Sequence, residues 1–189
     1  MEYGTVLVWW ALFQAIALAG LPVAAVLGHS LPDRGAGIAL PLALVVLFLP
    51  VYWVGHLSYG PVAIGVGISL LATTSLLAAW RGVEVRPRRH VEVMIAFTAA
   101  FALLVAIRGV DPSIHPAGGE KFLDYGLLRS TLRGTTLPPE DIWFAGEPVR
   151  YYYGGHLLSA ILATLADTAP KYAYNLALSG AYASLVATA

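Results

Sequence analysis

The most constraining feature of the sequence is a run of 46 residues, Gly35 to Trp80, that contains no Asp, Glu, Lys or Arg. Of the 189 residues, 58% are hydrophobic and only 12% are charged, whereas a soluble domain carries roughly 25% charged residues. This pattern excludes a soluble globular domain and a disordered chain. It also excludes a nucleic-acid-binding protein, which needs a basic surface. The sequence therefore predicts an integral membrane protein whose main partner is the lipid bilayer.

The apolar runs predict how often the chain crosses the bilayer. A helix needs about 20 apolar residues to cross, so the charge-free run is too long for one crossing, and it divides at the polar turn 55–61. We predict an all-α membrane protein with about six transmembrane helices, at Thr5–Leu27, Gly37–Val54, Pro61–Trp80, Val93–Ile107, Tyr152–Ala166 and Tyr172–Ala189. The last run ends without a polar tail, so we expect the chain to be a fragment of a longer protein.

The placement of arginine predicts the orientation in the membrane. The connection 81–90 holds four arginines against a single Glu84, and such loops remain on the cytoplasmic side. Alternation then places the amino terminus and residues 109–153 outside the cell, in a plasma-membrane protein. We expect three parts: a four-span bundle (1–108), an extracytoplasmic loop (109–153) and two further spans (154–189).

The long outer segment predicts a site. It holds ten of the charged residues, and its stretch Glu120–Arg133 reads as a helix that follows two glycines and stops at Gly134. At 100° per residue, Glu120 and Asp124 share one side of this helix, whereas Arg129 and Arg133 lie on the opposite side. The carboxylates could act as a base or bind a divalent cation such as Mg²⁺ or Mn²⁺. The alternative is an amphipathic helix that lies on the membrane surface.

A second motif follows the helix, at the entry to the next apolar run. Arg150 precedes Tyr151, Tyr152 and Tyr153, two glycines and His156. An arginine can bind phosphate, the phenols can donate hydrogen bonds, and a helix amino terminus favours anions. The alternatives are an aromatic anchor at the membrane interface and a histidine that only packs.

These motifs together resemble a known group of proteins. The elements Gly119-Glu120-Lys121-Phe122-Leu123-Asp124, Pro138-Pro139, Trp143-Phe144-Ala145-Gly146 and Tyr151–His156 resemble the uncharacterised YYY-motif membrane proteins of archaea and Chloroflexi. A wider resemblance is to the GT-C membrane glycosyltransferases. Glu120, Tyr125, Gly134, Pro138 and the tyrosine triplet follow the order of an acidic outer-loop motif, a helix, a turn and an aromatic entry to the next span. The usual acidic pair is adjacent, however, whereas Gly119 precedes Glu120 here.

The GT-C resemblance implies a transferase that takes a sugar from a polyprenyl-phosphate donor on the outer face of the membrane. Glu120 and Asp124 would be the acceptor base or the metal ligands. The substrate-binding residues would be Lys121, Arg150, Tyr151, Tyr152, Tyr153 and His156. The alternative function is a transporter, or a lipid-binding or structural membrane protein without enzymatic activity. A transporter would need ionisable residues at mid-membrane, and the first four predicted spans have none in their cores.

Overall fold

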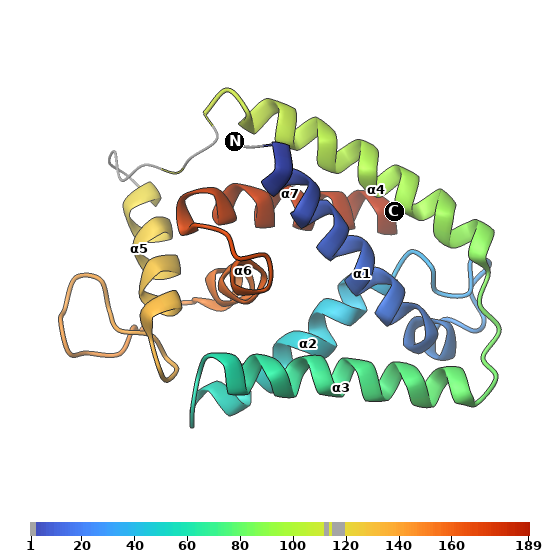
Figure 1. The fold of residues 1–189 in the computed structure, drawn as a ribbon, viewed down its shortest axis with the longest axis horizontal. Coiled ribbons are helices and arrows are strands. Elements are labelled where there is room, and N and C mark those ends of the chain that lie inside the picture. The colour runs from blue at the N-terminus through green and yellow to red at the C-terminus, as the bar shows by residue number, and fades with distance from the viewer. Residues whose placement is uncertain (1–2, 112–113, 115–119) are drawn as a thin grey trace.

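The computed structural model describes residues 3–111, 114 and 120–189, except for the Glu120 side chain. Within this part the chain is all helical, in agreement with the predicted class. The elements in order are α1 (Tyr3–Leu27), α2 (Ala39–Gly55), α3 (Pro61–Trp80), α4 (Pro87–Arg108), α5 (Glu120–Arg133), α6 (Gly154–Leu165) and α7 (Pro170–Thr188). Figure 1 shows α3, α4 and α7 running across the page, whereas α6 is viewed end-on.

Three helices of the described residues, α1, α3 and α4, are long and apolar enough to cross a membrane. The predicted count of six spans is not confirmed. α2 has 17 residues, which is the lower limit of about 17 for a crossing. The expected fifth span is a helix of only 12 residues, α6, and 12 residues reach about 18 Å of the roughly 30 Å hydrocarbon layer.

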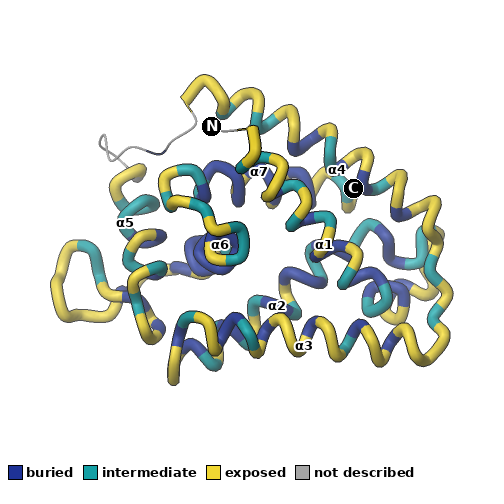
Figure 2. Tube along the Cα trace, viewed as in Figure 1, coloured by how far each residue is buried: buried dark blue, intermediate teal, exposed yellow. Residues whose placement is uncertain are grey.

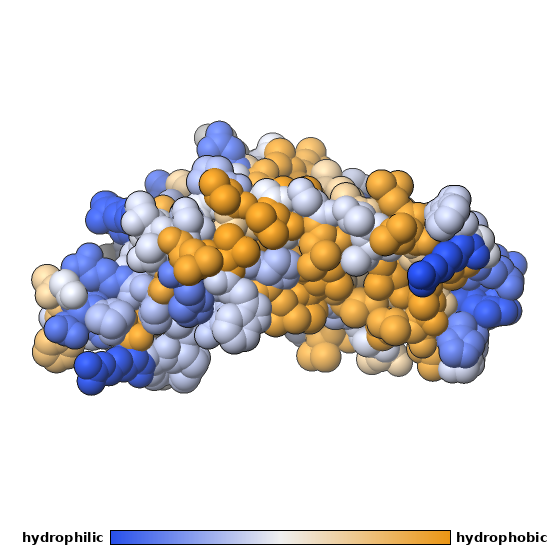
Figure 3. Space-filling view, turned by 90° about the horizontal axis from the view of Figure 1, so that it is seen from below, coloured by the Kyte–Doolittle hydropathy of each residue, from blue (hydrophilic) through white to orange (hydrophobic). Residues whose placement is uncertain are grey.

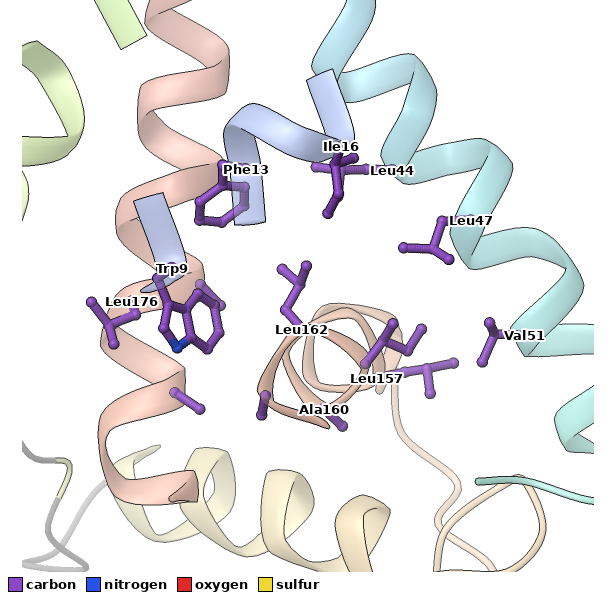
Figure 4. Close-up of a cluster of buried hydrophobic side chains, with 14 of the residues drawn as sticks. Trp9, Phe13, Ile16, Leu44, Leu47, Val51, Leu157, Ala160, Leu162 and Leu176 are labelled. Atoms are coloured by element: carbon purple, nitrogen blue, oxygen red, sulfur yellow. The ribbon is translucent and has the colours of Figure 1, made fainter. Parts of the chain in front are cut away.

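The core forms where α1, α2 and α7 surround α6. In Figure 4, Leu47 and Val51 of α2 lie on one side of the end-on helix α6, and Trp9 of α1 and helix α7 lie on the other, all within one buried cluster. The middle of α6 is buried, because residues 156, 157 and 159–163 are buried, whereas Gly154 and Gly155 at its start and Thr164 near its end are exposed. The short helix is therefore an internal element that the longer helices enclose.

A glycine fixes the closest approach between α1 and α7. A Cβ atom at Gly180 of α7 would overlap the Phe13 ring, so a larger residue would displace the ring. The same ring packs on Phe97 and Phe101 of α4, with centroids 5.5 and 5.9 Å away. The contact ties α1, α4 and α7 together beside α6.

The surface divides into a hydrophobic middle and two hydrophilic ends. In Figure 3 the middle of the visible face is hydrophobic, and hydrophilic residues gather at the left and right. We call the hydrophilic region at the left the α5 end (α5, residues 134–153 and the adjoining helix termini). We call the one at the right the arginine end (residues 28–38 and 81–92). The exposure pattern agrees, because large apolar side chains such as Leu76 of α3 and Ile95 and Leu103 of α4 are exposed along these helices (Figure 2). This surface suits a bilayer rather than water.

Candidate functional site

Helix α5 places Asp124 against the core. Residues three, four and seven positions after Asp124 share its side of the helix, and these are Leu127, Leu128 and Thr131, all at 0% exposure. Asp124 therefore lies on the buried side of α5, near the helix start. The predicted helix bounds, Glu120 to Arg133, agree with the structure.

Two side chains from distant segments bind the Asp124 carboxylate. The Nε2 atom of His156, in the first turn of α6, lies 3.0 Å from Asp124 Oδ1. The Tyr174 hydroxyl of α7 donates to Oδ2 at 2.9 Å. Because an ionised carboxylate only accepts, Nε2 carries the proton in this contact. The buried Nδ1 of His156 has no hydrogen-bond partner among the described residues.

Asp124 opens on its other side into a cavity of about 330 Å³, which we call the Asp124 pocket. Its walls come from the end of α4, from α5 and from the start of α7. They consist of Arg108, Asp111, Ile114, Lys121, Asp124, Tyr174 and Asn175. Lys121 lies 3.9 Å from a carboxylate oxygen of Asp111. The pocket therefore combines two cationic side chains with two carboxylates, of which Asp124 is held in place by two hydrogen bonds and Asp111 lies beside Lys121.

This arrangement fits proton transfer next to an anionic group. A fixed carboxylate can accept a proton from a hydroxyl, and Arg108 and Lys121 can stabilise negative charge that develops nearby. The described residues contain no group of three or more His, Asp or Glu side chains that could hold a metal ion. The Glu120 side chain lies outside the described residues, so the predicted cation site at Glu120 and Asp124 stays a prediction.

The tyrosine triplet divides into one buried and two exposed residues. Tyr153 is 9% exposed, and its ring stacks on Tyr52 of α2 with centroids 6.3 Å apart. Burial, together with the neighbouring Tyr52 phenol, raises the pKa of Tyr153 to about 12. Tyr151 and Tyr152 are exposed and lie against each other, with ring centroids 4.0 Å apart.

None of the triplet lines the Asp124 pocket, and neither does the exposed Arg150. Of the predicted binding residues, the structure brings Lys121 and His156 together with Asp124. Arg150, Tyr151 and Tyr152 lie apart, and Tyr153 packs against α2. Their predicted contacts with substrate stay predictions.

Comparison with known protein families found one family whose model matches most of the chain. Residues 46–189 match the family described as "Uncharacterized membrane protein (DUF2298)". The chain belongs to this family. Comparison with curated proteins and with solved structures found no match. The matched region of this DUF2298 protein includes the Asp124 pocket, the tyrosine triplet and the helices from α3 onward.

Sequence reasoning missed four pocket residues of the DUF2298 protein: Arg108, Asp111, Tyr174 and Asn175. Arg108 reads as an interfacial residue at the end of a span. Tyr174 and Asn175 stand at the start of an apolar run, and Asn175 is only 4% exposed. A polar pair at that position was the available signal, because a buried amide needs hydrogen-bond partners.

Proposed function

We propose that this DUF2298 protein is a GT-C-like membrane glycosyltransferase that transfers a sugar from a polyprenyl-phosphate donor to an acceptor hydroxyl. The observation that carries the proposal is the Asp124 pocket, where a carboxylate held by His156 and Tyr174 faces Arg108 and Lys121. Transfer from a phosphate leaving group needs a base for the acceptor and positive charge for the departing phosphate. The pocket supplies both.

The proposed reaction uses Asp124 as the base. Asp124 accepts the acceptor hydroxyl proton while the acceptor oxygen forms a bond to the anomeric carbon of the sugar. The bond between that carbon and the phosphate oxygen breaks, and the electron pair leaves with the lipid phosphate. Arg108 and Lys121 neutralise this phosphate. His156 and Tyr174 keep the carboxylate oriented.

The arrangement of the helices supports an outward-facing pocket. The arginine end holds Arg81, Arg86, Arg88 and Arg89, which favours the cytoplasmic side. Helices α4 and α7 run in opposite directions between the two ends (Figure 1). We propose five crossings, by α1, α2, α3, α4 and α7, with α6 enclosed and not spanning. In this proposed topology the α5 end lies outside the cell.

The deciding experiment measures sugar transfer by the purified protein in lipid nanodiscs. Radiolabelled polyprenyl-phosphate sugars serve as donors, with and without added Mg²⁺ or Mn²⁺. We expect transfer by the natural protein and a loss of about 10²–10⁴-fold in Asp124→Asn. Glu84→Gln at the arginine end is the matched control and should keep full activity.

Two outcomes would contradict the proposal. One is the absence of transfer by the folded natural protein with every donor. The other is transfer that Asp124→Asn does not change. Donor binding without turnover would instead favour a lipid-binding protein without enzymatic activity.

A further inference from the structure

A second cleft lies on the opposite side of α5 from Asp124. It has a volume of about 460 Å³ and runs between α5 and the segment that follows it. Arg129 and Arg133 form one wall, and Glu140, Asp141 and Trp143 form the other. At 100° per residue, the two arginines point about 140° and 180° away from Asp124. The cleft is therefore separate from the Asp124 pocket.

The segment opposite α5 is held in a defined shape. Residues 139–149 fold back on themselves, because Asp141 N–H donates to Glu147 O at 2.8 Å and Val149 N–H donates to Pro139 O at 2.9 Å. This hairpin projects beyond α5 at the left of Figure 1, at the end opposite the arginine end.

Two contacts attach the hairpin to α5. The Ser130 hydroxyl donates to Glu140 O at 2.6 Å. A Cβ atom at Gly126 would lie 2.8 Å from the end of the Ile142 side chain, so the glycine lets Ile142 pack directly on the helix. The cleft is preformed, and a ligand would not have to order it.

The polar groups of the cleft include both donors and acceptors. Within the described part of the chain, neither Arg129 nor Arg133 has an ion-pair partner, although Arg129 lies over the Tyr125 ring at 5.9 Å. Each guanidinium offers up to five N–H donors. The carboxylates of Glu140 and Asp141 also accept backbone N–H bonds within the hairpin, from Gly146 and Trp143 respectively.

An exposed aromatic surface completes the cleft. Trp143 is 63% exposed, and its indole stacks on Phe122 of α5 with centroids 6.0 Å apart. The stacking fixes the ring plane while one indole surface stays accessible to a ligand. The cleft thus joins a flat apolar surface to planar donors and acceptors.

We propose that this cleft binds a neutral saccharide. A sugar ring has an apolar C–H face for the indole, and its hydroxyls both donate and accept hydrogen bonds, which matches the guanidinium and carboxylate groups. A phosphate or another simple anion fits less well, because Glu140 and Asp141 offset the charge of Arg129 and Arg133. The inference does not depend on the proposed transferase reaction.

The test measures binding of mannotriose, cellotriose and chitotriose to the purified protein in detergent, by saturation-transfer NMR and calorimetry. We expect at least one to bind, and Trp143→Ala to weaken that binding about tenfold. Trp143→Phe keeps an aromatic ring and should restore most of the affinity. Phe144→Ala is the matched control, because Phe144 is 67% exposed but does not line the cleft.

The proposal is overturned if the folded protein binds none of the three saccharides, or if Trp143→Ala and Phe144→Ala have equal effects. Tighter binding of inorganic phosphate than of any saccharide would also overturn it. A protein that binds saccharide but fails the transfer assay would separate this inference from the proposed function. Asp124→Asn should leave saccharide binding at this cleft unchanged.

Discussion

The arginine end and the α5 end both carry charged residues, but they use them differently. At the arginine end the charges pair with each other, because Arg34 contacts Glu84 at 3.0 Å and Arg89 contacts Glu92 at 2.6 Å. At the α5 end, Lys121 lies 3.9 Å from Asp111, and both side chains line a cavity together with Arg108 and Asp124. Paired surface charges stabilise a protein weakly, whereas charges around a cavity can still bind a ligand.

The two ends also differ in what holds their connections in place. The Asp33 carboxylate accepts N–H bonds from Gly35 and Gly37, so polar groups shape the short connection. At the α5 end the long segment is held by a buried leucine. Leu137 packs against Gly55, and its N–H donates to the Gly55 carbonyl at 2.8 Å. The carboxylates of Glu140 and Asp141 shape the hairpin locally, and the buried leucine attaches the segment to the helix bundle.

The largest expected effect comes from removing that anchor. Leu137 is 5% exposed, so Leu137→Ala should lower the free energy of unfolding by about 2–5 kcal/mol. Leu31 at the arginine end is 43% exposed, and Leu31→Ala should change it by less than about 0.5 kcal/mol. Thermal unfolding of both variants in detergent checks the comparison. Equal losses of unfolding free energy in the two variants would contradict the proposed difference between the two connections.

The next effect concerns the contacts of Asp124. Tyr174→Phe removes one hydrogen bond to the carboxylate, and a hydrogen bond to a charged group contributes about 1.5–3 kcal/mol. We expect kcat for sugar transfer to fall by about 10–100-fold with little change in KM, because the base loses its orientation. Glu92→Gln, at the arginine end, should leave kcat unchanged. A rise in KM alone, or equal effects of the two substitutions, would contradict a positioning role for Tyr174.

A smaller effect should appear at alkaline pH. Burial raises the pKa of Tyr59, in the connection between α2 and α3, from 10.0 to about 12. The neutral phenol therefore contributes stability that is complete below pH 10 and is lost as the pH rises through about 12. Tyr59→Phe should flatten the fall in melting temperature over this range. Tyr152→Phe is the control, because Tyr152 is 74% exposed; an identical pH profile for both variants would contradict the prediction.

The smallest effect is expected for an ion pair at the arginine end. Arg34 and Glu84 have side chains that are 30% and 64% exposed, so their interaction should contribute less than about 1 kcal/mol and weaken with salt. A double-mutant cycle with Arg34→Gln and Glu84→Gln measures it. A coupling energy well above this value would show that the arginine end depends on its charges more than its exposure suggests.

Local sequence signals predicted most of the helices. The bounds of α3, Pro61 to Trp80, and of α5, Glu120 to Arg133, agree with the structure. A proline at the first position starts α3 and glycines flank α5, and such signals act within a few residues. The expected fifth span, Tyr152–Ala166, differs from the structure, where this region forms the 12-residue helix α6. An apolar run does not reveal whether a helix crosses the bilayer or lies enclosed among longer helices.

Part of the site could also be read from the sequence. Asp124 and His156 stand in conspicuous motifs, but their direct contact joins residues 32 positions apart. Tyr174 is 50 positions from Asp124 and does not belong to any motif recognised in the sequence. Sequence spacing on one helix places residues on a face, yet it says nothing about which side chains from other helices meet that face.

The sequence by itself determined the class of this protein, a helical membrane protein, and the helix α5 that bears Asp124. Hydropathy, proline and glycine act locally, so these properties need no knowledge of the fold. Only the tertiary structure decided that α6 is enclosed, that His156 and Tyr174 hold Asp124, and that Arg108 joins Lys121 at the same pocket. These features depend on how α4, α5, α6 and α7 pack, and packing is set by contacts between residues far apart in the chain.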